Sequence, residues 1–212
     1  MKCDLKMPSK INISSLLLDL GGVLIDWDPR YLYRPLFEGD EAAMERFLAE
    51  ICPPEWNRQM DAGRPFDEAI AERQRLFPEH SELIALWKSS WGQMLREPIH
   101  ETVEVVDALR KRGHRLYALT NWSAETFPVA RERFAFLNWF EDIVVSGEVK
   151  LAKPDPRIFE LTIERCGLTP ASTLFVDDMR PNVEAARGLG LHALHFEHPR
   201  KLRADLEAWN LL

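Results

Sequence analysis

The chain has little cysteine, no excess of positive charge and no long uninterrupted hydrophobic run. Its 212 residues include only three cysteines, Cys3, Cys52 and Cys166, which lie far apart and form no C-x-x-C pair. This usage argues against a disulfide framework or a zinc site and favours a reducing, cytoplasmic setting. The net charge of −7 argues against a nucleic-acid-binding surface.

No stretch approaches the ~20 apolar residues that cross a bilayer, so no membrane partner is expected. The apolar stretch near the N-terminus is short, is interrupted by Asn12, Ser14 and Ser15, and has no small-residue cleavage site. We expect it to form a first strand that ends at Asp19, after a loose tail at residues 1–10. Nothing in the sequence indicates an oligomeric state.

The second half of the chain alternates short apolar runs with longer helical patterns. Strands are predicted at residues 114–121, 142–147, 172–178 and 191–196, and helices at 100–112, 124–134, 156–166, 181–189 and 200–211. Such alternation is typical of a parallel sheet covered by helices on both faces. We therefore expect an α/β fold with a Rossmann-like core.

Residues 29–97 show a different pattern. Helices are predicted at 42–51, 66–77 and 81–95, separated by prolines and glycines, and no strand is predicted among them. We expect a core domain of residues 11–28 and 98–212, and a small helical domain of residues 29–97 inserted after the first strand.

Polar residues stand where several predicted strands end. They are Asp19 after the first strand, Thr120 and Asn121 after the second, Asp177 and Asp178 after a later one, and Lys153 just ahead of a helix. Because ligands of open parallel sheets bind beyond the carboxyl ends of the strands, we expect these side chains to surround one crevice.

Crowded carboxylates require protons or a cation to offset their repulsion. Mg²⁺ suits such a site because it takes oxygen ligands and keeps positions open for a substrate phosphate. The residues thus suggest phosphate chemistry, in which a metal ion and a lysine neutralise phosphoryl charge while a carboxylate attacks phosphorus.

Four segments, DLGGVL, LTN, KPDP and FVDD, occur in the order of the four motifs of the haloacid dehalogenase superfamily. The chain resembles these aspartate-nucleophile hydrolases from Ser14 to about Phe196. The helical insert resembles their cap domain, which closes over the site and selects the substrate. The segment from DLGGVL to RYLYRPLF resembles capped phosphatases of glucose 1-phosphate, and KPDPRIFE resembles the phosphatase domain of soluble epoxide hydrolases.

The resemblance implies a role for each motif residue. Asp19 would be the nucleophile that forms an aspartyl-phosphate intermediate. Thr120, the amide of Asn121 and Lys153 would hold the phosphoryl group, and Lys153 would also stabilise the nucleophile. The implied Mg²⁺ ligands are Asp19, the carbonyl of Gly21, Asp177 and Asp178, with Asp178 favoured as the direct ligand of the acidic pair.

One position departs from the superfamily. Most of its phosphatases have a second aspartate two residues after the nucleophile, which protonates the leaving oxygen, and here that residue is Gly21. Such a group contributes about 10²- to 10⁴-fold to the rate. Either the leaving group is an anomeric sugar oxygen that needs less protonation, or Asp26 or Asp28 takes over the role.

We expect a small, sugar-like phosphate ester as the substrate, contacted by Trp27, Arg30 and Trp122 beside the motifs. Further candidates for substrate contact in and around the insert are Arg34, Trp56, Arg64, Trp87 and Trp91. One alternative is a 2-haloacid dehalogenase, which needs no metal and against which the acidic pair argues. The other is a catalytically weak binding or regulatory domain, which Gly21 favours.

Overall fold

A parallel five-stranded sheet forms the centre of the computed structural model, which describes residues 12–212. The predicted tail at residues 1–10 lies outside the described residues. The strands run in the order β5-β4-β1-β6-β7. They are β1 (Ser15–Leu18), β4 (Arg115–Thr120), β5 (Asp142–Val145), β6 (Thr173–Asp177) and β7 (His192–His195). The predicted α/β, Rossmann-like core is confirmed.

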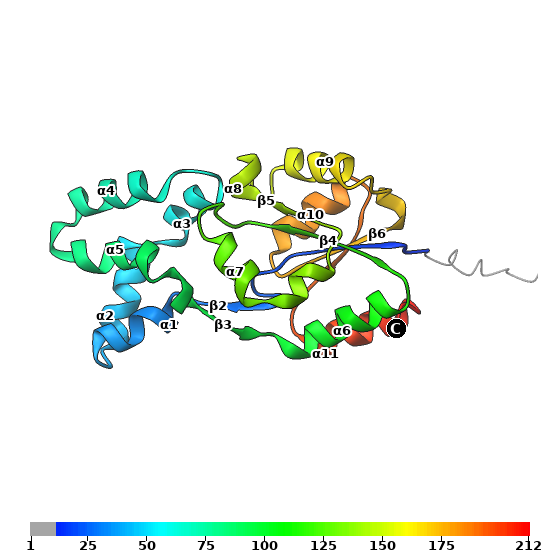
Figure 1. Cartoon of the computed structure of the whole chain (residues 1–212), viewed down its shortest axis with the longest axis horizontal. Coiled ribbons are helices and arrows are strands. Elements are labelled where there is room, and N and C mark those ends of the chain that lie inside the picture. The colour runs from blue at the N-terminus through cyan, green and yellow to red at the C-terminus, as the bar shows by residue number, and fades with distance from the viewer. Residues whose placement is uncertain (1–11) are drawn as a thin grey trace, which may run out of the picture.

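Helices cover both faces of this sheet (Figure 1). One face carries α6 (His100–Lys111), α7 (Phe127–Arg133) and α11 (Pro199–Ala208), and the other carries α9 (Pro156–Arg165) and α10 (Arg180–Gly188). Because side chains alternate along a strand, Leu16 and Leu18 of β1 join the first hydrophobic layer, whereas Leu17 joins the second. The central strand is therefore buried on both sides.

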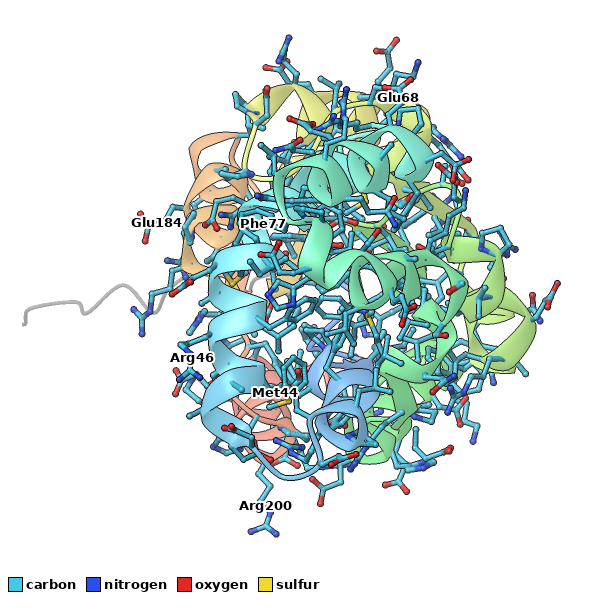
Figure 2. The ribbon with its side chains drawn as sticks, turned by 90° about the vertical axis from the view of Figure 1, so that its left-hand side faces the viewer. Met44, Arg46, Glu68, Phe77, Glu184 and Arg200 are labelled. Atoms are coloured by element: carbon cyan, nitrogen blue, oxygen red, sulfur yellow. The ribbon has the colours of Figure 1, made fainter. Side chains whose placement is uncertain are left out.

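A helical insertion lies beyond the carboxyl ends of the core strands, on the left in Figure 1. It contains α1 (Arg30–Tyr33), α2 (Glu41–Arg46), α3 (Pro54–Asp61), α4 (Phe66–Leu76) and α5 (Ser81–Ser89). Its interior is aromatic, with the ring of Tyr33 4.9 Å from that of Phe47 and 5.9 Å from that of Trp87. Arg46 and Glu68 point outward from this end of the molecule (Figure 2).

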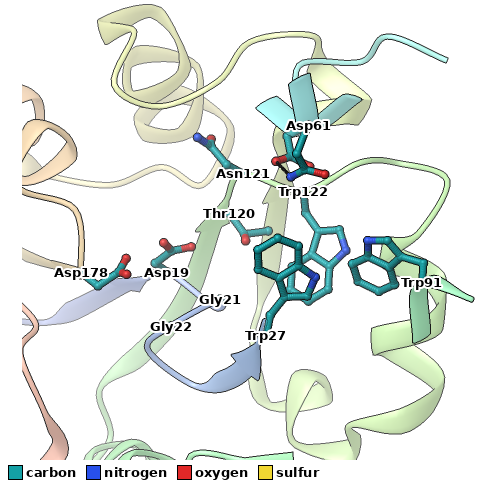
Figure 3. Close-up of a pocket in the computed structure, with 11 residues that line it drawn as sticks. Asp19, Gly21, Gly22, Trp27, Asp61, Trp91, Thr120, Asn121, Trp122 and Asp178 are labelled. Atoms are coloured by element: carbon teal, nitrogen blue, oxygen red, sulfur yellow. Dashed lines mark hydrogen bonds between the residues drawn. The ribbon is translucent and has the colours of Figure 1, made fainter. Parts of the chain in front are cut away.

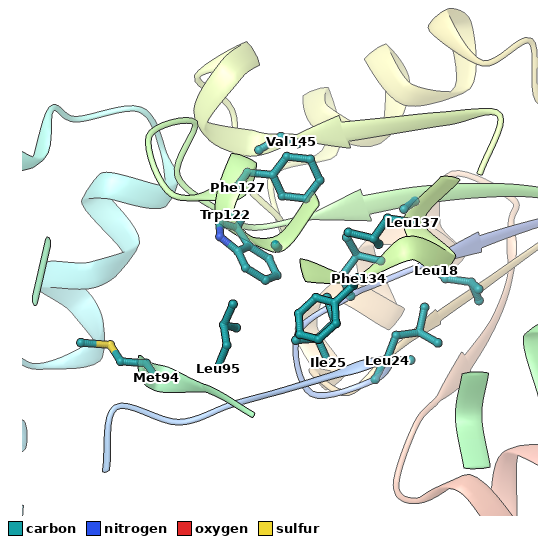
Figure 4. Packing of buried hydrophobic residues seen from close by; sticks show 14 of the residues in the cluster. Leu18, Leu24, Ile25, Met94, Leu95, Trp122, Phe127, Phe134, Leu137 and Val145 are labelled. Atoms are coloured by element: carbon teal, nitrogen blue, oxygen red, sulfur yellow. The ribbon is translucent and has the colours of Figure 1, made fainter. Parts of the chain in front are cut away.

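A two-stranded antiparallel sheet joins the insertion to the core. It pairs β2 (Ile25–Trp27) with β3 (Leu95–Pro98). The expectation that residues 29–97 contain no strand was wrong, and the helix predicted at 81–95 ends at Ser89. The strand pairing joins segments about 70 residues apart, a contact that local periodicity does not contain. Ile25 and Leu95 pack among buried side chains that include Trp122 and Phe134 (Figure 4).

Helix α3 was also not predicted from the sequence. It follows Pro53, with Pro54 at its first position, where the missing proline N–H would be unpaired in any case. Two consecutive prolines obscured this start. Its last residue, Asp61, faces the site described below. None of the helices between residues 12 and 212 is long and apolar enough to cross a membrane.

Candidate active site

Three neighbouring strands bring polar side chains to one edge of the sheet. β1 lies between β4 and β6 and runs parallel to both, so their carboxyl ends meet. Asp19 follows β1, Thr120 ends β4 and Asp177 ends β6. All three are buried, with exposed fractions of 8%, 1% and 0%. The parallel pairing thus gathers residues that are more than 150 positions apart.

Lys153 lies at the centre of this group. Its Nζ is 2.9 Å from Oδ1 of Asp19 and 2.7 Å from Oδ2 of Asp177, and it donates a hydrogen bond to the carbonyl oxygen of Leu119. The side chain of Asn121 holds the backbone of Lys153 from both sides, since it accepts from the amide and donates to the carbonyl. The ammonium group is therefore fixed between two carboxylates.

The two aspartates of FVDD occupy different positions. Both oxygens of Asp177 accept hydrogen bonds from Asn182 Nδ2, and Asp177 also accepts from the amide of Met179 and from Lys153. Asp178 instead lines the cavity beside Asp19. Asp177 is thus occupied in holding the cluster together, whereas the carboxylate of Asp178 faces the space where a ligand would bind.

The clustered acids have perturbed protonation. Burial raises the pKa of Asp19 to about 7, the ammonium of Lys153 opposes this, and the charges of Asp177 and Asp178 add to it. Burial and Asp177 likewise raise the pKa of Asp178. Burial alone would lower the pKa of Lys153, but the two carboxylates beside it raise that pKa. The site holds more negative than positive charge.

This donor set fits a hard divalent cation. Oxygen atoms of Asp19, Asp177 and Asp178 all lie within 4.8 Å of one another. One ammonium group faces three carboxylates, and burial together with the neighbouring negative charges raises the pKa of both Asp19 and Asp178. Mg²⁺ bound by carboxylate oxygens would offset this excess of negative charge.

The two glycines that follow Asp19 and Leu20 differ in their surroundings. Gly22 has a φ of +71°, and a Cβ built on it would lie 2.7 Å from Oδ2 of Asp178, so a side chain there would displace that carboxylate. A Cβ on Gly21 would meet no atom within 4 Å, and Gly21 lines the cavity. Gly22 is required by the local geometry, whereas Gly21 leaves open space.

A cavity of about 230 Å³ opens over these residues (Figure 3). The core lines it with Asp19, Gly21, Thr120, Asn121 and Asp178, and three tryptophans, Trp27, Trp91 and Trp122, line the side away from Asp178. The rings of Trp91 and Trp122 are 5.3 Å apart. Trp27 and Trp122, both predicted to contact substrate, therefore lie at the cavity.

Arg30, also predicted to contact substrate, does not line this cavity. It forms ion pairs with Glu45 and Asp28 and borders a neighbouring chamber instead. Asp26 accepts hydrogen bonds from the hydroxyl of Tyr31, and neither Asp26 nor Asp28 lines the cavity. The structure thus gives no support to either aspartate as the substitute acid.

The other candidates in and around the insert are distributed unevenly. Trp91 lines the cavity and Trp87 lines the neighbouring chamber. Trp56 is buried against Trp87, as expected for a core residue. Arg34 and Arg64 pair with glutamates of the insertion and line neither of these two spaces.

Two cavity residues were missed from the sequence, Asn57 and Asp61 of α3. Nδ2 of Asn57 donates to Oδ2 of Asp61 at 2.9 Å, and Oδ1 of Asn57 accepts from the indole of Trp87 at 3.1 Å. Their four-residue spacing places both on one side of a helix. That spacing was the available signal, but it depended on recognising α3.

Comparisons with known proteins identify the family of this chain. A profile of haloacid dehalogenase-like hydrolases matches residues 13–190. A sesquiterpene phosphatase of Aspergillus oryzae is 27% identical over 84% of this chain and 87% of its own length. A phosphorylated carbohydrates phosphatase of Thermotoga maritima is 24% identical over 86% of this chain and 84% of its own. Acyl-CoA dehydrogenase family member 10 of Mus musculus is 33% identical over 50% of this chain, which is 10% of that protein.

Solved structures agree. A HAD family enzyme of Bacteroides thetaiotaomicron, crystallised with magnesium and inorganic phosphate, superposes with a TM-score of 0.66 at 26% identity, covering 88% of this chain and 96% of that one. The family match extends over all four motifs. The chain belongs to the haloacid dehalogenase-like hydrolases, as those motifs predicted.

Proposed function

We propose that the chain is a Mg²⁺-dependent phosphatase that hydrolyses a small phosphomonoester through an aspartyl-phosphate intermediate. The observation that carries this proposal is the buried ammonium of Lys153 between Asp19 and Asp177, beside a cavity that Asp178 also lines. Phosphatases among the relatives, and a structural neighbour that contains magnesium and phosphate, support it.

Asp19 is the proposed nucleophile. Its Oδ1 contacts Lys153 Nζ and accepts the amide of Leu20 at 2.8 Å, whereas Oδ2 accepts no hydrogen bond from residues 12–212. Oδ2 is therefore the oxygen available to attack phosphorus, so that a new O–P bond forms as the ester O–P bond breaks. Lys153 keeps the carboxylate oriented and offsets its charge.

The phosphoryl oxygens would be held by the end of β4. The hydroxyl of Thr120 and the backbone amide of Asn121 are the proposed donors, with Lys153 supplying positive charge.

The proposed holders of Mg²⁺ are Asp19, the carbonyl of Gly21, Asp177 and Asp178. Asp178 is the favoured direct ligand because the oxygens of Asp177 already accept hydrogen bonds. When bound, the ion would stabilise negative charge on the phosphoryl group.

A sugar-like leaving group is supported by the cavity walls. Tryptophan faces pack well against the C–H faces of sugar rings, and Trp27, Trp91 and Trp122 surround a space of about 230 Å³. The indole Nε1 atoms of Trp27 and Trp122 are buried without a hydrogen-bond partner in the described part of the chain, so they are available as donors to hydroxyl groups. The carbohydrate phosphatase among the relatives is consistent with this class.

A second substrate class is favoured by a specific feature. A chamber of about 420 Å³ adjoins the cavity and shares Trp27 and Asn57 with it. Apolar groups of Leu48, Ala49 and Cys52 line this chamber. An apolar leaving group would fit there, and one relative is named as a sesquiterpene phosphatase.

Residues 29–97 are proposed to act as a cap domain on a core of residues 11–28 and 98–212. α3 contributes to the walls of both spaces and α5 to the wall of the second chamber, so the insertion would select the leaving group. The proposed partner is a small-molecule phosphate ester that enters between cap and core.

Phosphate release from a panel of sugar phosphates and prenyl phosphates, with Mg²⁺ or with EDTA, tests the proposal. Mg²⁺-dependent release that Asp19→Asn abolishes is expected, together with acid-stable label on the wild-type protein from a ³²P-substrate. Preference for prenyl phosphates would select the second substrate class. Halide release from 2-haloacids without metal, or no turnover at all, would contradict the proposed function.

A further inference from the structure

The proposed reaction needs a group that protonates the leaving oxygen and then accepts a proton from the attacking water. Three carboxyl groups line the cavity, those of Asp19, Asp178 and Asp61. Asp19 and Asp178 belong to the acidic cluster beside Lys153, and their proposed roles in attacking phosphorus and holding Mg²⁺ require ionised carboxylates. Asp61 lies across the cavity from them, on the insertion (Figure 3). Among residues 12–212 it is the only carboxyl group lining the cavity that is outside that cluster.

The side chain of Asp61 is held from its own helix. Oδ2 accepts a hydrogen bond from Asn57 one turn earlier, and Asn57 is fixed in turn by the indole N–H of Trp87. Because Asn57 has both its amide nitrogen and its amide oxygen engaged, its orientation is determined. This chain of hydrogen bonds points the carboxyl group of Asp61 toward the cavity.

The backbone of Asp61 is held by the core. The hydroxyl of Ser146, the first residue of α8 (Ser146–Val149), donates to the carbonyl oxygen of Asp61 and accepts from the amide of Trp122 at 2.8 Å. One buried hydroxyl thus joins the end of α3 to a cavity wall that follows β4. Asp61 faces Asp19 because the insertion and the core meet at this point.

The environment of Asp61 favours its protonated form. Burial raises the pKa of Asp61 to about 8, a hydrogen bond from the backbone of Ser123 opposes this, and the charge of Asp19 adds to it. Arg58 on the same helix lowers the pKa slightly. At neutral pH the carboxyl group can therefore donate a proton.

Other charged groups near the end of α3 are directed elsewhere. The stem of Lys150, which follows α8, packs against Gly63. Glu125, which follows the wall residue Trp122, accepts the amide of Phe66 and pairs with Lys88. No cation pairs with the Asp61 carboxyl within the described chain, which is consistent with its neutral form.

We propose that Asp61 is the general acid and base of this phosphatase, a catalytic residue supplied by the insertion. As the bond from phosphorus to the leaving oxygen breaks, the proton of Asp61 passes to that oxygen. Water then attacks the aspartyl phosphate, its proton returns to Asp61, and the bond between phosphorus and Asp19 breaks to release phosphate. This inference rests on the proposed function. It assigns to the insertion the acid–base role for which Gly21 has no side chain.

The test compares Asp61→Asn with wild type on two substrates. With an alkyl phosphate such as glycerol phosphate, whose leaving oxygen needs a proton, we expect turnover to fall by about 10²- to 10⁴-fold. With p-nitrophenyl phosphate, whose leaving group needs none, the variant should still release a burst of one nitrophenol per site, followed by slow turnover because water attack lacks its base.

Two controls separate this role from others. Asp67→Asn, at an exposed carboxylate of the same insertion, should leave both rates unchanged. Gly21→Asp added to Asp61→Asn should restore part of the alkyl phosphate activity, because position 21 has open space. Thermal melting of each variant shows whether it is folded.

The outcomes distinguish a failure of the proposed role of Asp61 from a failure of the proposed function. Alkyl phosphate turnover of Asp61→Asn within about twofold of wild type would overturn the role of Asp61 while leaving the phosphatase function intact. Equal losses in the rate of leaving-group release from both substrates would show that Asp61 only positions other groups, and would also overturn it. A wild-type protein that releases no phosphate from either substrate would contradict the proposed function itself.

Discussion

At the scale of single residues, adjacent positions in one motif serve different ends. Gly22 adopts a left-handed conformation against the carboxylate of Asp178, so its lack of a side chain shapes the acidic cluster. Gly21 faces open space, so sterics do not explain why this position lacks the carboxylate that most phosphatases of the superfamily have there. The sequence pattern DLGG makes the two glycines look equivalent, but only the three-dimensional contacts separate them.

Gly22→Ala is therefore expected to harm both folding and metal binding. A non-glycine residue at a φ of +71° costs about 1–2 kcal/mol, and the new Cβ would also displace Asp178. Urea denaturation should show this loss, and calorimetric titration should show weaker Mg²⁺ binding. Gly21→Ala is the matched control and should retain wild-type stability. Equal destabilisation by the two substitutions would contradict the assignment.

The protonation of Asp61 predicts a pH dependence of stability. Its pKa rises from 3.8 to about 8 in the folded protein, so the folded state binds a proton that the unfolded state releases. The stabilisation from this proton is complete below pH ~4 and is lost as the pH rises toward about 8. Relative to Asp61→Asn, the free energy of unfolding of the wild type should decline across this window.

Urea denaturation in EDTA at several pH values measures that difference. Asn is the matched replacement because it does not titrate and keeps nearly the same shape. A wild-type-minus-variant difference that stays constant, or increases, from pH 5 to 8 would show that Asp61 is ionised in the folded protein.

At the scale of elements, the sequence predicted what the parallel sheet itself brings together. Asp19, Thr120 and Asp177 could be grouped because the ends of neighbouring parallel strands meet at one edge. Strand β3 and helix α3 were not found, since one depends on pairing with a distant strand and the other begins after two prolines. Asp61 was missed for the same reason, because its place at the cavity comes from contacts between α3 and α8.

Ser146 tests that contact between elements. Ser146→Ala removes the hydroxyl that joins the backbone of Asp61 to that of Trp122, at a net cost of about 1 kcal/mol for a typical hydrogen bond. If this energy holds Asp61 in place during the reaction, kcat should fall by up to about tenfold while KM changes little. Steady-state kinetics with an alkyl phosphate measures both constants.

Ser89→Ala is the matched control for this prediction, because the Ser89 hydroxyl donates a hydrogen bond to the carbonyl of Ala85 within its own helix. A Ser146→Ala enzyme with unchanged kcat would mean that the contact between α3 and α8 has no part in catalysis.

At the scale of the whole molecule, the substrate would bind where the insertion and the core share walls. The core provides the carboxylates, Thr120 and Lys153, and the insertion provides Asn57, Asp61 and the apolar lining of the second chamber. Trp27 on β2 borders both spaces and belongs to the sheet that joins the two parts. Its indole would therefore limit how far a leaving group extends from the proposed phosphate site.

Trp27→Ala should change substrate preference by joining the two chambers. Small sugar phosphates would lose an aromatic contact of roughly 1 kcal/mol, so their kcat/KM should fall by about 3- to 10-fold. Phosphates with a longer apolar group should gain, because the space of about 420 Å³ becomes accessible. Trp139→Ala is the control, since Trp139 packs beside Phe136 and lines neither chamber. A uniform loss across all substrates would show that Trp27 supports the fold without dividing the chambers.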